Sequence, residues 1–208
     1  MRHELYANPH DGLKWTVACR TAQTTSAVGI LQVAMLLEDA GHPPEDDVDP
    51  RADPTISRFF RGEHLAFARG EHRLITRILT LGPLVGRQIE VIDAPYRNRS
   101  SARDDYFNQT VRQLLSREHE RRDVVLLDPD SGIAGANAGP NHVRPEHIRQ
   151  VWDAMKAGDT LLVYQAYQHS LNAKADQLRA ALGWGTNVTV TDFGGPNIRI
   201  AFLWAVKP

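Results

Sequence analysis

The sequence predicts a three-layer α/β sandwich of Rossmann-like type, in which a mostly parallel sheet ends in a C-terminal antiparallel hairpin. Three observations support this fold class. Runs of consecutive apolar residues bounded by polar turns are typical of strands covered on both faces, as in a parallel sheet. Amphipathic helical patterns alternate with these runs. The last segment instead holds two strand-like runs joined by a short Gly-Gly-Pro-Asn link, which indicates a hairpin.

The expected strands are the apolar runs themselves, taken in chain order. They cover 30–37 (ILQVAMLL), 88–93 (QIEVID), 123–128 (DVVLLD) and 160–165 (TLLVYQ), with the hairpin strands at 187–193 and 198–206. An edge strand of this hairpin could pair with a second copy, so a homodimer is compatible with the pattern.

Helices are expected between the strands at 14–22, from Asp53-Pro54 to about 81, at 101–115, 145–158 and 170–183. Ser101 and Asp104 resemble a capping box, and Pro145 suits the first turn of a helix that Gly158 would end. Gly62 and Gly70 are expected to break the long second helix. The run from 117 to 122 is interpreted as the exposed end of a helix.

The acidic, proline-rich stretch 42–53 has no apolar periodicity, so it is expected to be a flexible loop within a single domain spanning 1–208. The chain has 24 Lys and Arg against 25 Asp and Glu, which excludes the strongly basic surface of a non-specific DNA binder. A single cysteine, Cys19, excludes a disulfide framework and is expected in the core. With neither a membrane span nor a signal segment in the sequence, a cytoplasmic protein without membrane contact is expected.

Carboxylates follow three of the expected strands, at the sheet edge where open parallel sheets bind ligands. Glu38 and Asp39 follow the first strand, Asp93 the second, and Asp128 and Asp130 the third. Like charges gathered in one cleft need a cation to offset them, and hard oxygen ligands suit Mg²⁺ or Mn²⁺. These residues are therefore the predicted metal ligands, although Asp128 and Asp130 could instead form Asx turns that cap the strand.

Several further side chains are candidates for catalysis or substrate binding. His169 could act as a general base and Lys14 could stabilise a transition-state charge. The alternatives are purely structural roles: His169 would cap a helix, and Lys14 would form an exposed ion pair with Asp11. The predicted substrate-binding residues follow the second, third and fourth strands; they are Arg97, Ser131, Gln165 and Tyr167.

The sequence lacks the motifs of several enzyme and cofactor-binding classes. No G-x-G-x-x-G or P-loop follows a strand, and neither H-E-x-x-H nor G-x-S-x-G occurs. These absences weaken NAD-binding, P-loop, zinc-protease and α/β-hydrolase interpretations.

Four pieces of sequence together resemble a family of uncharacterised bacterial and phage-associated α/β proteins. They are the Tyr6…Asp11…Lys14 spacing, the D-P-D-S-G loop at 128–132, His142-Val143 with Glu146, and the V-Y-Q strand end at 163–165. The D-P-D-[NS]-G loop and the V-Y-Q end are the specific pieces. The family's V-Y-Q-H would place a histidine where Ala166 stands, three residues before His169.

Two other groups are distantly similar. Glu38 and the Asp128-x-Asp130 pattern resemble Toprim domains, which implies magnesium-dependent chemistry on nucleic-acid phosphodiesters. D-P-D standing where D-P-P-Y would occur resembles S-adenosylmethionine-dependent methyltransferases, although Glu38 to His42 contains one glycine only.

The leading prediction is a magnesium-dependent enzyme acting on a phosphoester, with a phosphate-containing substrate such as a nucleic acid or nucleotide. The alternative is an S-adenosylmethionine-dependent methyltransferase-like enzyme, in which Asp93 would contact a ribose. A third interpretation is a non-catalytic binding or inhibitory module with an acidic surface. Carboxylates that point into solvent without a shared cavity would favour that third interpretation.

Overall fold

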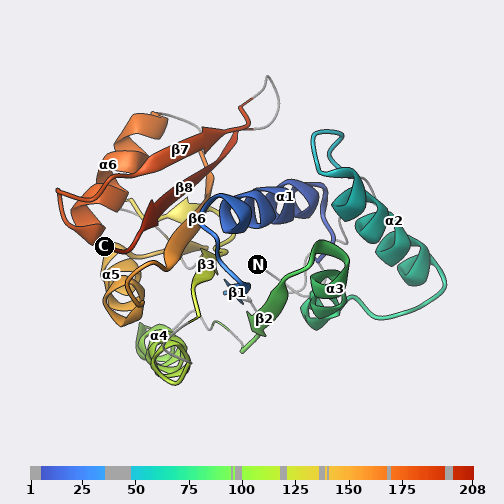
Figure 1. The fold of residues 1–208 in the computed structure, drawn as a ribbon, viewed down its shortest axis with the longest axis horizontal. Coiled ribbons are helices and arrows are strands. Elements are labelled where there is room, and N and C mark those ends of the chain that lie inside the picture. Colours follow the sequence, from blue (N-terminus) through green and yellow to red (C-terminus); the bar gives the residue numbers. More distant parts are fainter. Residues whose placement is uncertain are drawn as a thin grey trace.

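The computed structural model describes residues 6–35, 48–94, 96, 100–117, 121–135, 139, 141–167, 170–194 and 199–208. Its main sheet has six strands in the order β2-β1-β3-β6-β8-β7 (Figure 1). Their bounds are β1 Gly29–Val33, β2 Gln88–Ile92, β3 Asp123–Leu127, β6 Thr160–Ala166, β7 Thr189–Asp192 and β8 Ile200–Val206. A small parallel ribbon of β4 (Gly132–Ile133) and β5 (His142–Val143) follows β3.

The topology confirms the predicted fold class. β1 pairs in parallel with β2 on one side and with β3 on the other, and β3 pairs in parallel with β6. β8 runs antiparallel to both β6 and β7, so the C-terminal hairpin adds the two remaining strands and leaves β7 at the edge. The order of the strands along the chain reverses between β1 and β3.

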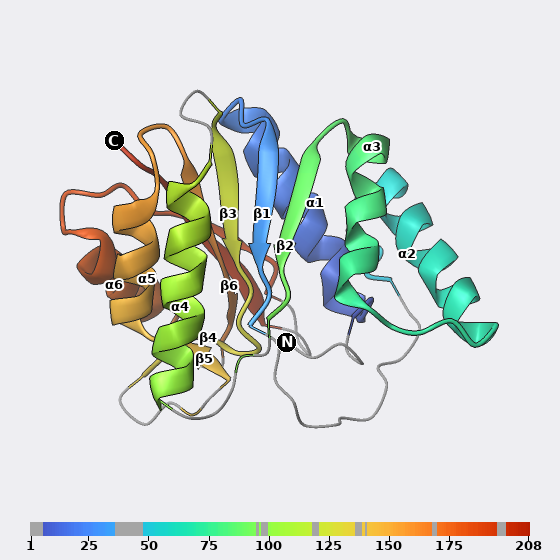
Figure 2. The ribbon, with the colours of Figure 1, turned by 90° about the horizontal axis from the view of Figure 1, so that it is seen from below.

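Helices cover both faces of the sheet and complete the three layers (Figure 2). One face carries α1 (Pro9–Thr24), α2 (Pro54–Ala68), the 3₁₀-helix η2 (Ile75–Thr80) and α3 (Leu81–Val85); the other carries α4 (Ser100–Leu115), α5 (Pro145–Ala154) and α6 (Leu171–Leu182). Alternate residues of β3 serve the two cores, since Val124 packs with Leu13 and Phe60 while Val125 packs with Phe107 and Ile148. Among the helices of the described residues, none has the length and apolar character needed to cross a bilayer.

The structure differs from the prediction at several element ends. α1 begins at Pro9, not at residue 14, because Asn8 caps it by accepting a hydrogen bond from the His10 amide. α2 passes through Gly62 and ends before Gly70, which adopts a left-handed φ of 93°. The two-residue strands β4 and β5 were not predicted, being too short for a periodic pattern. In the described part of the predicted 42–53 loop, Val48 and Ala52 are buried against the α1 core.

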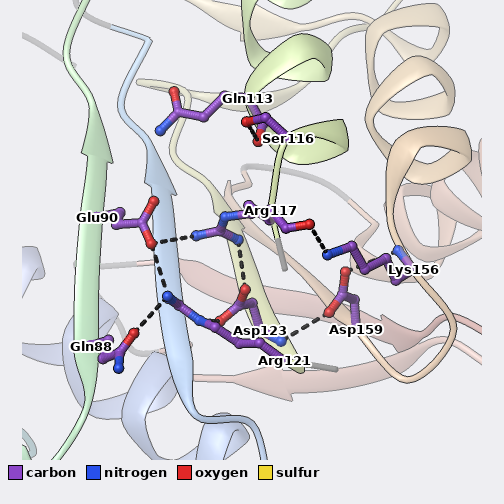
Figure 3. Close-up of polar contacts among 9 residues, drawn as sticks. All are labelled: Gln88, Glu90, Gln113, Ser116, Arg117, Arg121, Asp123, Lys156 and Asp159. Atoms are coloured by element: carbon purple, nitrogen blue, oxygen red, sulfur yellow. Dashed lines mark hydrogen bonds and ion pairs between the residues drawn. The ribbon is translucent and has the colours of Figure 1, made fainter. Parts of the chain in front are cut away.

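The predicted exposed helix end at 117–122 is wrong for its described residues (Figure 3). At the amino-terminal edge of the sheet, Arg117 and Arg121 each form an ion pair with the buried Asp123, at 2.8 Å and 2.7 Å, and both also reach Glu90. Asp159 accepts a hydrogen bond from the Asp123 amide. Because β3 begins with a buried acid, the preceding arginines fold over it; we call this group the amino-edge ion cluster.

Candidate functional site

A buried lysine lies between two carboxylates at the opposite, carboxyl-terminal edge. The Lys14 ammonium is 2.8 Å from an oxygen of Asp11 and 2.8 Å from an oxygen of Asp128, and the three side chains are at most 4% exposed. Burial alone would lower the pKa of Lys14, but the two carboxylates outweigh it and raise that pKa above its usual value. Lys14 is therefore a fixed cation, not a base.

Each carboxylate of this group is held by further contacts. Asp11 accepts hydrogen bonds from the Ala7 amide at 2.8 Å and the Asn8 amide at 3.3 Å, while burial raises the pKa of Asp11 against the opposing charge of Lys14. The second oxygen of Asp128 accepts a hydrogen bond of 2.7 Å from Gln32, the polar residue near the end of β1. One oxygen of Asp128 thus has a hydrogen-bond donor, and the other has the ion pair with Lys14 but no hydrogen bond of its own among the described residues.

The loop after β3 is fixed by Gln165 at the end of β6. The Gln165 carboxamide accepts a hydrogen bond from the Ile133 amide at 2.8 Å and donates one to the Ser131 carbonyl at 3.2 Å. It therefore replaces one peptide unit of a neighbouring strand. Gly132, at φ 99°, lies directly beneath this carboxamide, and a Cβ there would overlap it. The left-handed φ and the close approach of Gln165 both require glycine at this position of the D-P-D-S-G loop.

A cavity of about 250 Å³ opens beside the lysine, between the start of α1 and the loop after β3. Its lining residues are Asn8, Pro9, His10, Lys14, Asp128, Pro129, Asp130 and Tyr164. We call it the carboxyl-edge pocket. Burial raises the pKa of the Tyr164 phenol to about 12, so the hydroxyl stays protonated at neutral pH. Burial and then the charge of Lys14 lower the pKa of His10, which leaves its imidazole neutral.

Two residues near the pocket adopt left-handed backbone conformations that are rare outside glycine. Ala7 has φ 65° and donates to Asp11; its carbonyl lies 2.8 Å from Nε2 of the α2 residue His64. Met35, two residues after β1, has φ 44°, and its amide donates to the Tyr106 hydroxyl at 3.0 Å. Backbone strain of this kind concentrates at ligand sites, where surrounding contacts hold it in place.

The structure does not support the predicted magnesium site among the residues that it describes. No group of three or more His, Cys, Asp or Glu side chains converges there in a way that could hold a metal ion. Asp128 is neutralised by Lys14 and Gln32, and Asp93 is exposed at the end of β2. The sequence argument expected a cation to offset the acids, and the protein supplies that cation as Lys14. Glu38 and Asp39 lie outside the described residues.

Of the other predicted site residues, some line the pocket and others do not. Asp130 and Lys14 line the pocket with Asp128, and the exposed Asp11–Lys14 pair proposed as the structural alternative is in fact buried. Ser131 and Gln165 bind each other through the loop contact described above. The Tyr167 hydroxyl donates to Asp192 at 2.7 Å instead of facing the pocket. His169 and Arg97 lie outside the described residues.

Sequence reasoning missed three residues of the site. Tyr164 lines the pocket, yet the prediction chose its neighbour Gln165 because that residue ends the apolar run. Gln32 was a visible signal, since it is the polar residue inside ILQVAMLL. His10 gave no signal before the start of α1 was known.

The buried carboxylate and the shared cavity disfavour the non-catalytic interpretation. Asp128 is 1% exposed and lines the same cavity as Asp130, whereas an acidic docking surface would present its carboxylates to solvent.

The chain matches no protein-family model and no curated protein sequence. Among solved structures, it is similar to a DUF574 family protein from Streptomyces avermitilis, with a TM-score of 0.46 and 9% identity over 96% of this chain and 82% of that chain. Cofactor-bound Rv0187 from MTB gives a TM-score of 0.41 and 15% identity over 92% and 78% of the two chains. Precorrin-6y C5,15-methyltransferase from Geobacter metallireducens gives 0.35 and 13% over 89% and 87%. At these TM-scores and identities, the likenesses do not establish a shared activity.

Proposed function

We propose that this protein is an S-adenosylmethionine-dependent methyltransferase whose cofactor binds across the carboxyl end of β1. The chain places β2 on one side of β1 and then β3 and β6 on the other, so the strand order reverses at β1. In open α/β sheets, the crevice at such a reversal is where ligands bind. The carboxyl-edge pocket lies beside this reversal: its lining comes from the start of α1, the loop after β3 and Tyr164 of β6, and Gln32 of β1 donates a hydrogen bond to Asp128.

The negative charge of the pocket is the observation that carries the proposal. Three carboxyl groups, Asp11, Asp128 and Asp130, stand against the single ammonium of Lys14, while His10 is neutral. The balance stays negative even when Asp11 is protonated. A negative cavity repels a phosphate group and attracts a cation such as a sulfonium. This charge favours S-adenosylmethionine over a phosphate-bearing nucleotide.

The residues around the end of β1 fit a nucleoside. An acid after the second strand of such folds binds ribose hydroxyls, and Asp93 stands there, exposed and free to accept hydrogen bonds. Burial is the main cause of the raised pKa of Tyr106, and both Asp128 and Asp93 add to it. The Tyr106 hydroxyl lies at the end of β1, where it accepts a hydrogen bond from the Met35 amide. Met35 makes the left-handed turn that a glycine makes in many nucleotide-binding loops.

In this proposal, the protein binds and orients the cofactor. Asp93 would hold the ribose, and Lys14, held between Asp11 and Asp128, would stay protonated beside the pocket. S-adenosylmethionine, when bound, supplies a methyl group activated on sulfur.

Calorimetry with S-adenosylmethionine and ATP tests the proposal, because both ligands carry adenosine and differ in charge. We expect S-adenosylmethionine to bind and to raise the melting temperature, and ATP to bind at least about tenfold more weakly, a difference of ~1.4 kcal/mol. Asp93→Asn should weaken binding, whereas Asp105→Asn, an exposed acid on α4, should not. An absence of heat and of any thermal shift at millimolar S-adenosylmethionine, or a preference for ATP, would refute the proposal.

A further inference from the structure

Asp130 is a carboxylate that the described part of the protein leaves without a partner. It is half-buried at the mouth of the carboxyl-edge pocket, and no described residue forms an ion pair or hydrogen bond with it. In contrast, Asp11 and Asp128 at the same edge are paired with Lys14, and Asp123 at the other edge is paired with arginines. An unpaired carboxylate in a cavity is poised to bind a cationic ligand.

Tyr164 provides a second, independent indication of a ligand. Only 6% of its surface is exposed, its side chain lines the same pocket, and its hydroxyl has no hydrogen-bond partner among the described residues. The ring is enclosed while its hydroxyl oxygen keeps some accessible surface, so that oxygen is open to a ligand in the pocket. Since the hydroxyl can accept a hydrogen bond, a donor group bound in the pocket would satisfy it.

The other polar groups of the pocket exclude an anion as this ligand. Both carboxylates beside Lys14 contact its ammonium, and the ammonium also lies 5.0 Å from the centre of the Tyr164 ring. The start of α1 is equally occupied: the His10 amide donates to the Asn8 side chain, and the Asp11 amide donates to the Asn8 carbonyl. The pocket therefore offers acceptors to its ligand and no cationic group that is not already paired.

We propose that Asp130 and Tyr164 bind a protonated primary amine, with the carboxylate and the phenol oxygen accepting hydrogen bonds from one alkylammonium group. The cavity of about 250 Å³ suits the ammonium end of a substrate and a short alkyl chain. A sulfonium donates no hydrogen bond, so this ligand is distinct from the proposed cofactor. That the amine is the methyl acceptor rests on the proposed function, whereas its binding does not.

Titration of the full chain with n-butylamine, followed by NMR chemical shifts and without S-adenosylmethionine, tests the proposal. n-Butanol is the matched neutral ligand and MgCl₂ the competing cation. We expect saturable binding of n-butylamine at millimolar concentration, with shifts at the pocket residues, and no binding of n-butanol. Asp130→Asn should weaken the amine about 10- to 100-fold, as expected for a lost charge-assisted hydrogen bond, and Tyr164→Phe should weaken it by a smaller factor. Asp105→Asn is the control and should bind like the wild type.

Each outcome decides the assignment. Equal binding of amine and alcohol, wild-type affinity in Asp130→Asn, or saturable binding of Mg²⁺ with no binding of the amine would overturn it. Asp130 is half-buried and Tyr164→Phe removes one atom, so both variants are expected to fold, and circular dichroism checks this. Amine binding without S-adenosylmethionine binding would support this inference and refute the methyltransferase proposal. Binding of S-adenosylmethionine without binding of the amine would support the methyltransferase proposal and refute this inference.

Discussion

Replacing Lys14 with methionine tests how much the buried ion pairs of Lys14 contribute to the stability of the protein. The substitution keeps the length of the side chain and removes the ammonium that lies 2.8 Å from both Asp11 and Asp128. Breaking a buried ion pair by removing one partner costs about 3–5 kcal/mol, because a charge is left buried without compensation. Since small domains have stabilities of about 5–15 kcal/mol, urea unfolding should detect the loss easily.

The loss should also depend on pH, in a direction that follows from the carboxyl groups. Without the ammonium, the folded-state pKa of Asp11, which burial already raises, rises further above the unfolded value of about 3.9. The folded state then holds protons that the unfolded state releases, so stability falls as pH rises above about 4. Lys14→Met should therefore be closest to the wild type at pH 4.5 and furthest from it at pH 8.

A variant with all three charges removed provides the control. Asp11→Asn, Lys14→Met and Asp128→Asn together should recover part of the stability lost by Lys14→Met alone, because no uncompensated charge remains. A Lys14→Met variant that loses less than about 1 kcal/mol, equally at both pH values, would refute the reasoning.

Three further predictions concern the loop, the opposite edge and the pocket. Gly132→Ala should lower the free energy of unfolding, measured in urea, by about 2–5 kcal/mol, because the left-handed φ and the overlap with Gln165 both oppose a Cβ. An unchanged urea midpoint would contradict the proposed contact between Gly132 and Gln165. Asp123→Asn should destabilise the fold by about 3 kcal/mol through the loss of its pairing with Arg117, yet leave n-butylamine affinity unchanged, since it lies at the other edge; a parallel loss of binding would show that the two edges are coupled. Lowering the pH from 7 through the pKa of His10, which lies below its usual value, should create an imidazolium that weakens n-butylamine binding, so the loss should be smaller in His10→Gln than in the wild type; equal pH profiles would exclude His10 as the titrating group.

The fold was predictable because each core strand repeats one simple pattern. The runs that became β1, β3 and β6 are largely apolar on both faces, which favours a parallel sheet covered on both sides. The antiparallel hairpin followed from its short link. Element ends were less predictable: the start of α1 depends on a cap at Asn8 that precedes any apolar pattern, and Gly62 is tolerated inside α2 because it faces open space.

The site was predictable only where it follows a strand. Asp128 and Asp130 were found because they end a buried run, and chain position alone places them at the sheet edge. The burial of Lys14 depends on how α1 packs on the sheet, and a local sequence pattern does not predict that packing. One signal was present: residues 11 to 18 of α1 are all buried, and a helix without a clear polar face is typically enclosed on all sides. A lysine in such a helix needs a buried partner.

The acids at the two edges of the sheet differ in how many cations pair with them, and this difference indicates that the carboxyl edge is functional. In the amino-edge ion cluster, Asp123 is matched by two arginines, an arrangement that stabilises the start of β3. At the carboxyl edge, one ammonium serves Asp11 and Asp128, and Asp130 is left unmatched beside them. A buried ion pair contributes little net stability compared with apolar residues of similar size, so stability alone does not explain this arrangement. Left-handed backbone does not separate the two edges, because Ala7 and Met35 lie at the carboxyl edge and Ser26, at φ 55°, lies at the amino edge. The difference is in charge: the unmatched acid, Asp130, lies at the carboxyl edge, and a ligand that carries positive charge is the simplest physical reason for it.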